Sequence, residues 1–301
     1  MASPQGEGWD SYRGIYTLDG ILNIYKEKGY TSHDVVAILR KKLSIKRIGH
    51  TGTLDPNAEG VLVVCLGRAT KAVSYLEADS KRYIAELTLG FTTDTGDIWG
   101  NILSEKNVDL SEEEIKSAIL SFKGKISQVP PMYSALKVNG KKLYELAREG
   151  IEVKRKARDI EIFNIEIISI DENKVSFEVF CSKGTYIRTL CEDIGAKLGV
   201  GATMSALERI QAGNFKKETA IKLDDITTES MENYLIDMEE VFKDYPRIEL
   251  KGKDSFRYLN GIRFEVEYNE GSYAIYIDDK FIGIGKVEDG ILRSEKRFNI
   301  D

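Results

Sequence analysis

Apolar residues at helical spacing predict the main helices of this chain. In TSHDVVAILRKKL the apolar residues recur every three or four positions, and Thr31 or Ser32 supplies the N-cap. Ser111 and Glu114 form a capping box before a helix in EEIKSAILSF. The segment KGTYIRTLCEDIGAKLG is amphipathic, and its helix is expected to end at Gly199.

Other segments carry the patterns of strands. The continuous apolar run VLVVCLG is typical of a strand buried on both faces, whereas KRYIAELTLG alternates between apolar and polar residues. DIEIFNIEIISI and KVSFEVFCS also alternate and are separated by a short DEN turn, which predicts a hairpin. GILNIY and ATMSALERIQAGNF are expected to be strands as well. The Gly- and Thr-rich stretch RIGHTGTLDPNAEG predicts irregular structure.

This mixture of helices and antiparallel hairpins predicts an α+β fold with a mixed, largely antiparallel sheet. After Tyr245 the chain changes to short strands separated by closely spaced turns, which indicates a second, smaller β-rich domain. We therefore expect a disordered leader at 1–15, a large domain at 16–244 and a small domain at 245–301.

The overall charge conceals two opposite local charges. The 301 residues carry a net charge of −6. Residues 123–158 contain ten Lys or Arg and three Glu, which gives 10 − 3 = +7. Residues 218–240 contain one Lys and eight Asp or Glu, which gives 1 − 8 = −7, and we expect a surface helical segment there. A local basic surface is what a nucleic acid responds to, so RNA remains a candidate partner.

Composition also limits the location and the chemistry. The N-terminus lacks the basic and apolar regions of a signal peptide, and no apolar run approaches the roughly 20 residues that span a bilayer. The three cysteines, Cys65, Cys181 and Cys191, fit no metal or redox spacing and lie in apolar stretches. With only two histidines in the chain, we expect no metal site. These features predict a cytoplasmic protein with reduced thiols.

The loop GHTGTLDP at 49–56 holds the most informative candidate residue. Asp55 is a carboxylate in a Gly-rich loop that precedes a buried strand, a common place for a functional site. An isolated Asp-Pro pair would by itself indicate only a turn.

Five ordered motifs resolve this ambiguity. GHTGTLDPNAEGVLVVCLGRATK is followed by SKRYIAELTLGFTTDTGD, QVPPMYSALKVNGKKLYELAREGIEVKRKAR, CSKGTYIRTLCEDIG and GATMSALERIQAGNF. Together they resemble the TruB-type tRNA pseudouridine synthases over residues 18–220. The resemblance implies an isomerase that converts a T-loop uridine of tRNA, at position 55 in tRNA numbering, into pseudouridine. It also implies a PUA-like, RNA-binding β-barrel at 245–301.

The resemblance implies a role for several residues. Asp55 matches the catalytic carboxylate, Tyr83 the tyrosine that stacks on the flipped base, and Arg188 the arginine that pairs with the carboxylate. Further matches are His50, which fills or flanks the vacated space in the RNA loop, Tyr186 in the pocket, and Leu207 against the base. The usual Asp-Lys-Pro motif reads Tyr25-Lys26-Glu27 here, and only Lys26 is retained as a substrate-binding residue.

A basic insertion completes the resemblance. Residues 130–158 match the family's thumb, which clamps the T-arm of tRNA. Its expected phosphate-binding cations are Lys141, Lys142, Arg148, Lys154, Arg155, Lys156 and Arg158. The alternative to phosphate binding is that these cations form a surface segment that contacts only solvent.

Three functions remain open at this point. The leading prediction is a stand-alone enzyme that needs no cofactor, because the isomerisation consumes neither electrons nor water, and no obligate protein partner; we expect a monomer. One alternative is a guide-RNA-dependent pseudouridylase of the dyskerin type. The other is an RNA-folding chaperone in which catalysis is incidental.

Overall fold

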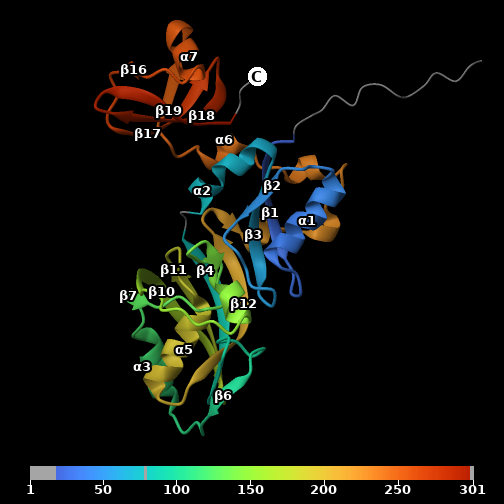
Figure 1. The fold of residues 1–301 in the computed structure, drawn as a ribbon, viewed down its shortest axis with the longest axis vertical. Helices are drawn as coiled ribbons and strands as arrows, with labels where there is room; N and C mark the ends of the chain where they lie inside the picture. Colours follow the sequence, from blue (N-terminus) through green and yellow to red (C-terminus); the bar gives the residue numbers. More distant parts are fainter. Residues whose placement is uncertain (1–17, 78–79, 299–301) are drawn as a thin grey trace, which may run out of the picture. The chain divides into compact units, whose positions relative to one another are not determined.

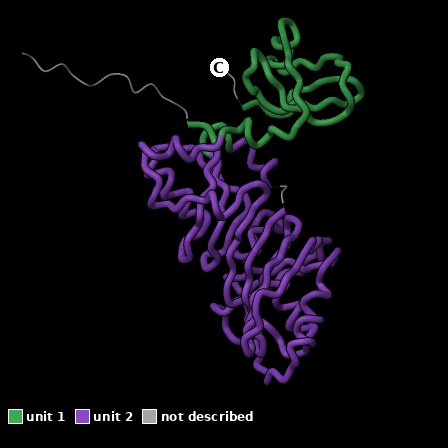
Figure 2. Tube along the Cα trace, turned by 180° about the vertical axis from the view of Figure 1, so that it is seen from behind, with its two compact units in different colours: residues 1–20, 66–69, 237–301 green, residues 21–65, 70–236 purple. Residues whose placement is uncertain are grey.

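The computed structural model describes residues 18–77 and 80–298, and these form two compact units (Figure 2). The large unit comprises residues 21–65 and 70–236. The small unit comprises, among the described residues, 18–20, 66–69 and 237–298. The expected leader at 1–15 lies outside the described residues.

A mixed ten-stranded sheet organises the large unit (Figure 1). Its main path runs β14-β1-β3-β12-β4-β11-β10-β7, with β2 paired to β3 and β13 to β12. The ten strands are β1 (Gly20–Lys26), β2 (Ile48–Thr51), β3 (Glu59–Leu66), β4 (Lys81–Leu89), β7 (Gly124–Gln128), β10 (Arg158–Asp171), β11 (Lys174–Cys181), β12 (Ala202–Ala212), β13 (Phe215–Lys216) and β14 (Ile221–Lys222).

The sheet is antiparallel from β12 to β7, while β3 runs parallel to β12 and β1 parallel to β14. Gly60 makes the close pairing of β3 with β12 possible. Its φ is +108°, and a Cβ at this position would lie 2.2 Å from the carbonyl oxygen of Arg209. Only glycine fits, so the end of β12 is drawn against the start of β3.

Helices and short hairpins surround this sheet. Thr31 and Asp34 form a capping box at the start of α1, and Ser111 and Glu114 form the expected one at the start of α3. The helices are α1 (Ser32–Leu43), α2 (Val73–Leu76), α3 (Glu112–Leu120), α4 (Leu143–Arg148) and α5 (Ile187–Leu198), with 3-10 turns at η1 (Gly67–Ala72), η2 (Lys217–Thr219), η3 (Leu223–Asp225) and η4 (Met231–Tyr234). Two small hairpins pair β5 (Phe91–Thr93) with β6 (Ile102–Glu105) and β8 (Lys137–Val138) with β9 (Lys141–Lys142).

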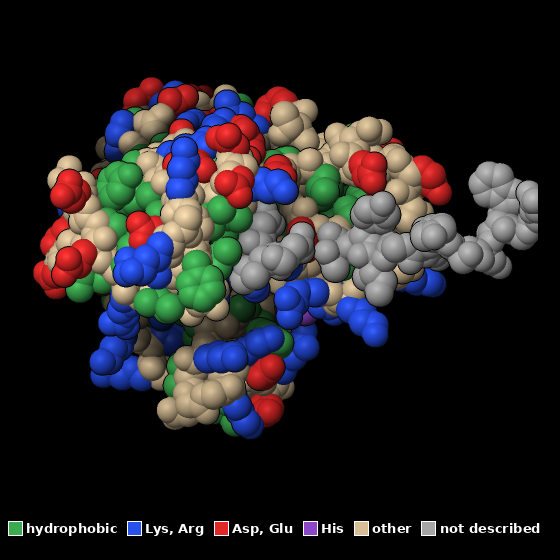
Figure 3. All heavy atoms as spheres, turned by 90° about the horizontal axis from the view of Figure 1, so that it is seen from above, with side chains coloured by type: hydrophobic (Ala, Val, Ile, Leu, Met, Phe, Trp, Pro, Cys, Tyr) green, Lys and Arg blue, Asp and Glu red, His purple; other side chains and the backbone are tan. Residues whose placement is uncertain are grey.

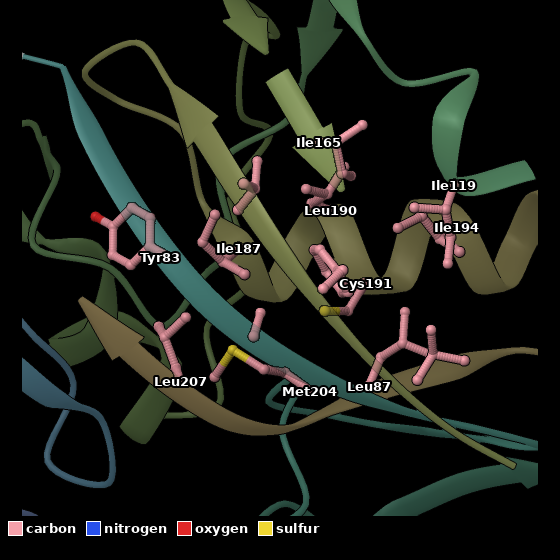
Figure 4. Close-up of a cluster of buried hydrophobic side chains, with 14 of the residues drawn as sticks. Tyr83, Leu87, Ile119, Ile165, Ile187, Leu190, Cys191, Ile194, Met204 and Leu207 are labelled. Atoms are coloured by element: carbon pink, nitrogen blue, oxygen red, sulfur yellow. The ribbon is translucent and has the colours of Figure 1, made fainter. Parts of the chain in front are cut away.

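The hydrophobic core of the large unit lies between α5 and the sheet (Figure 4). Leu190, Cys191 and Ile194 project from α5 toward Leu87 on β4 and Met204 on β12. The alternation in β4 and β12 directs one set of side chains into this cluster, as expected for strands with a covered face. The same cluster reaches Tyr83 and Leu207, so the rigid core extends to the candidate site.

The small unit contains a five-stranded curled sheet in the order β15-β17-β18-β19-β16. Tyr258, Ile275 and Leu292 are fully buried in its core. Its elements are α6 (Met238–Val241), β15 (Arg247–Leu250), α7 (Gly252–Leu259), β16 (Phe264–Glu265), β17 (Gly271–Ile277), β18 (Lys280–Glu288) and β19 (Ile291–Arg297). The expected α+β class, with an additional C-terminal β unit, is confirmed.

Two local expectations were wrong. The stretch 47–60 is not wholly irregular, because β2 forms within it and pairs with β3. The acidic stretch 218–240 forms no long surface helix. Its residues Ile221 and Lys222 form β14 beside β1, and 3-10 turns bury Leu223 and Met231.

Candidate active site

The loop between β2 and β3 carries Asp55 and is fixed by hydrogen bonds on both sides. Ser32, at the start of α1, binds both backbone groups of Leu54, at 2.9 Å to the amide nitrogen and 3.2 Å to the carbonyl oxygen. The Gly29 amide donates to the Pro56 carbonyl at 2.9 Å, and the Ala58 amide donates to the Asp55 carbonyl at 3.1 Å. The backbone around Asp55 is therefore held before any ligand arrives.

Asp55 forms a two-point contact with Arg188. The Arg188 Nε lies 2.9 Å from Asp55 Oδ2, and its Nη2 lies 3.4 Å from Oδ1. The arginine side chain is only 6% exposed, whereas that of the aspartate is 37% exposed. The guanidinium also donates to the Thr95 carbonyl at 2.9 Å and to the Tyr133 carbonyl at 2.5 Å. This arrangement fixes the position and orientation of an accessible carboxylate.

The pocket next to Asp55 has a volume of about 710 Å³. Tyr83 from β4 and Leu207 from β12 both line it and are both largely buried. Figure 4 shows the ring of Tyr83 at the end of the core cluster, with its hydroxyl pointing away from that cluster. Burial raises the pKa of Tyr83 to about 12, so its phenol is neutral near pH 7. The pocket thus combines an apolar, aromatic wall with one accessible carboxylate.

Tyr186 and Arg158 also line this pocket. Buried Gln128 positions Tyr186, because the Tyr186 amide donates to Gln128 Oε1 at 2.8 Å and Gln128 Nε2 donates to the Tyr186 carbonyl at 3.1 Å. Burial raises the pKa of the Tyr186 hydroxyl. Of the residues predicted from the sequence, the structure therefore brings Asp55, Tyr83, Arg158, Tyr186, Arg188 and Leu207 into one pocket.

Sequence reasoning missed Arg209, which lines the same pocket although it is 1% exposed. Its Nε donates to the Val61 carbonyl at 2.7 Å and its Nη2 to the Gly52 carbonyl at 3.0 Å, so it joins β12 to β3 and to the Asp55 loop. A hydrogen bond and the charge of Arg209 also favour the ionised form of Tyr83, against the larger effect of burial on the Tyr83 pKa.

The structure does not place Lys26, which is expected to bind substrate, among the residues that line the pocket. Lys26 has no exposed surface, and its ammonium donates to the Tyr30, Glu27 and Pro56 carbonyls at 2.7, 3.2 and 3.2 Å. Burial lowers the Lys26 pKa to about 8. The lysine therefore lies beneath the Asp55 loop and supports its backbone.

His50 lies on β2 outside the main pocket and lines a neighbouring hollow of about 540 Å³. Its ring meets that of His33 edge to face, with 5.3 Å between centroids. Burial, reinforced by His33 and Arg209, lowers the His50 pKa to about 4. The structure thus places His50 beside the pocket as a neutral ring.

The cations of the segment 130–158, here called the thumb segment, fall into three groups. Arg155 is tied down, because it donates to the Pro130 carbonyl at 3.3 Å and to Glu152 at 3.1 Å. Other cations contact partners on the surface of the segment: Lys141 with Glu149, and Lys142 and Arg148 with the Tyr144 ring. The remaining cations are exposed and form no ion pair in the described part of the chain, namely Lys137, Lys154, Lys156 and Arg158.

Two other kinds of feature are absent from residues 18–77 and 80–298. Within these ranges there is no group of three or more His, Cys, Asp or Glu side chains arranged to hold a metal ion. None of the helices there has the length and apolar character needed to cross a membrane. The three cysteines are buried and free.

Comparison with known proteins identifies the family. The family model described as "TruB family pseudouridylate synthase (N terminal domain)" matches residues 40–187. The model described as "tRNA pseudouridylate synthase B C-terminal domain" matches residues 188–243. Curated proteins named tRNA pseudouridine synthase B are similar over almost the whole chain. The protein of Clostridium perfringens is 49% identical, covering 94% of this chain and 98% of its own, and that of Alkaliphilus oremlandii is 48% identical, covering 90% and 93%.

Solved structures agree on the fold. A Cbf5-Nop10-Gar1 complex contains a chain that is 28% identical, covers 93% of this chain and 85% of its own, and gives a TM-score of 0.71. The archaeal box H/ACA sRNP Nop10-Cbf5 complex gives 28% identity, 95% and 88% coverage and a TM-score of 0.70. With two matching family descriptions and relatives nearly 50% identical along its length, the chain belongs to the TruB family of pseudouridylate synthases and is an isomerase of that class.

Proposed function

We propose that the chain converts the T-loop uridine at position 55 of tRNA into pseudouridine, with Asp55 as the catalytic carboxylate. The observation that carries the proposal is the accessible Asp55 carboxylate, held at two points by the buried Arg188 at the wall of the pocket. The tRNA substrate follows from relatives named tRNA pseudouridine synthase B at 48–49% identity.

The reaction requires a carboxylate beside the ribose. The C1′–N1 bond breaks, the uracil turns, and a C1′–C5 bond forms; the proton on C5 leaves and N1 regains one. An ionised Asp55 can either attack C1′ or take the proton from C2′. Arg188 serves both routes, because its two contacts aim the carboxylate oxygens of Asp55.

Tyr83 and Leu207 are proposed to hold the base after it leaves the RNA stack. Flipping a base costs a few kcal/mol, and stacking on an aromatic ring returns roughly 1–3 kcal/mol. Both side chains belong to the core cluster, so this wall of the pocket is preorganised. An apolar wall also limits water, which would compete with the detached uracil for C1′.

The exposed thumb-segment cations are proposed to hold the T-arm through its phosphates. Lys154 and Lys156 suit this role, since they are exposed and free of ion pairs in the described residues. Arg158 extends the same positive charge to the rim of the pocket. Residues 245–301 are proposed to be a second RNA-binding domain of the PUA type.

A guide-RNA-dependent activity is the second candidate, favoured by the structural similarity to chains solved in Cbf5 complexes. The identity to those chains is 28%, compared with 49% to a protein named tRNA pseudouridine synthase B. This difference supports the stand-alone enzyme.

The test is to incubate the purified chain alone with an unmodified tRNA transcript and to map pseudouridine by chemical labelling. A transcript with cytidine in place of uridine 55 is the matched control. Pseudouridine at position 55 of the first transcript only is the expected result. Modification at another position, or modification that requires an added guide RNA, would overturn the proposal.

A further inference from the structure

A second basic cluster lies at the end of α1, far in sequence from the thumb segment. Residues 40–47 contain five Lys or Arg and no acid, within a chain of net charge −6. Of these five, Lys42 is engaged, donating to the Leu223 carbonyl at 2.5 Å and lying 3.8 Å from Asp224. We call the other four, Arg40, Lys41, Lys46 and Arg47, the α1-end cluster.

The α1-end cluster is exposed and not neutralised. All four side chains are exposed, and none lies within 4 Å of a carboxylate among the described residues. Arg40 donates to the Ile48 carbonyl at 2.9 Å, which fixes one cation beside β2 without cancelling its charge. Four like charges within eight residues repel one another, so this arrangement favours a bound polyanion.

A purely structural explanation accounts for only part of the cluster. Cations in the last turn of a helix interact favourably with its dipole, and Arg40 and Lys41 occupy that turn of α1. Lys46 and Arg47 lie beyond the helix, after Ser44 has turned the chain through a left-handed conformation with φ of 56°. The helix dipole gives no reason for cations at these two positions.

The cluster borders the hollow of about 540 Å³ that contains His50. Arg40, Lys46 and Arg47 line this hollow together with the small or apolar residues Ile48, Gly49 and Val73. A lining that combines cations with apolar residues suits a nucleotide, whose phosphate is charged and whose sugar and base are largely not.

This hollow adjoins the active pocket along two segments of the chain. On the first, residues 46–50 line the hollow and residues 52–55 line the pocket. On the second, residues 70 and 73 line the hollow and residues 74 and 77 line the pocket. Figure 1 shows α1, β2 and α2 grouped at this side of the large unit, and β2 contacts both helices. The hollow and the active pocket are therefore lined by neighbouring residues on both segments.

We propose that the α1-end cluster binds backbone phosphates of the RNA strand that carries the target uridine into the pocket. The inference rests on the proposed function, since it takes tRNA as the polyanion. The cluster and the thumb segment would then hold the RNA at two separate places, one next to the Asp55 loop and one along residues 130–158. On the face that Figure 3 shows, Lys and Arg side chains form some groups of their own and elsewhere lie mixed with Asp and Glu.

The test uses Lys46→Ala/Arg47→Ala in the full chain, with Arg47→Gln as a milder variant. The control Lys116→Ala/Lys174→Ala removes the same charge from α3 and from the end of β11 opposite the pocket. Each protein is titrated with whole tRNA and with the isolated T-arm stem-loop at several salt concentrations. The slope of log affinity against log salt falls by roughly 0.7–0.9 for each phosphate that the protein no longer neutralises, so the slope for the double variant should fall by about 1.4–1.8 on both RNAs.

Several outcomes separate the possibilities. For Arg47→Gln the slope should fall by about half as much, and for the control it should not change. In turnover assays the defect of the double variant should lie mainly in KM rather than in kcat. An unchanged slope on both RNAs, or a change on whole tRNA alone, would overturn the assignment to the strand next to the target. If the wild-type protein binds tRNA but forms no pseudouridine, the proposed function fails and the binding result still decides this inference.

Discussion

Charges in the pocket and charges on the thumb segment are held in different ways. Arg188 and Arg209 are almost fully buried, and each donates to at least two backbone carbonyls. Lys154 and Lys156 are exposed and form no ion pair among the described residues. Buried charges are retained only where partners fix them, whereas exposed charges interact weakly and are screened by salt. Fixed charges suit a chemical step, and unfixed ones suit the holding of a polyanion.

After replacement of Asp55 itself, substitution of Arg188 in the Asp55–Arg188 pair is expected to lower the catalytic rate most. Arg188→Met keeps the bulk but removes the guanidinium, so the Asp55 carboxylate loses its two-point contact and is no longer aimed. Removal of one preorganised electrostatic interaction typically lowers the rate by about 10²–10³-fold. We expect such a fall in single-turnover rate, together with a smaller change in tRNA affinity. A single-turnover rate close to that of the wild type would show that the contact between Arg188 and Asp55 does not serve the chemical step.

Substitution of Tyr83 tests the role of its hydroxyl group in the pocket. Tyr83→Phe keeps the ring in the core cluster and removes the hydroxyl that interacts with Arg209. A hydrogen bond to a charged group contributes roughly 1.5–3 kcal/mol, so we expect a fall in turnover of about 10- to 100-fold with near-normal binding. Single-turnover kinetics at saturating tRNA measures this. Wild-type turnover would mean that the ring alone matters.

The thumb segment should respond in binding and in salt dependence. Lys154→Ala/Lys156→Ala should weaken tRNA binding and reduce the log–log salt slope by roughly 1.4–1.8, while the rate for bound tRNA changes little. Arg155→Ala is the matched contrast, because Arg155 is tied to Pro130 and Glu152 and should mainly affect thermal stability. If the double variant kept the wild-type slope, the exposed lysines would be solvated rather than bound to phosphate.

His50 gives the smallest effect, in stability rather than in rate. Its folded-state pKa of about 4 lies below the ordinary 6.5, because burial and neighbouring cations disfavour the charged ring. The neutral His50 ring therefore contributes to the free energy of unfolding above pH 6.5, and this contribution is lost as the pH falls from 6.5 toward 4. In that pH range the unfolded chain binds nearly one proton more than the folded chain, because only the unfolded His50 is protonated. Unfolding measured at several pH values should show a shallower decline in stability for His50→Gln than for wild type. Identical slopes would contradict the buried, neutral ring.

Local rules predicted much of the fold. The capping box of Ser111 and Glu114, the end of α5 at Gly199 and the hairpin of β10 with β11 all depend on residues close in sequence, and all three formed as expected. The acidic stretch 218–240 did not, because β14 pairs with β1, some 200 residues earlier in the chain. Such pairing is decided by distant partners that a local pattern does not contain.

The candidate site shows the same limit. The motifs pointed to Asp55, Tyr83 and Arg188, and the structure brings these three into one pocket. Lys26 and Arg209 could not be interpreted from sequence, because both residue types are normally exposed and both are buried here against backbone carbonyls. Pro56 beside Lys26, and Val61 and Gly52 beside Arg209, are distant in sequence, so only the tertiary structure reveals these contacts.

The most direct test of the central claim is a paired measurement on Asp55→Asn. The substitution keeps the shape of the side chain and removes its negative charge, while the exposed cations of the thumb segment are untouched. We predict no detectable pseudouridine in a single-turnover reaction at saturating tRNA, together with a tRNA dissociation constant close to that of the wild type. Substantial pseudouridine formation by this variant would contradict the assignment of Asp55 as the catalytic carboxylate.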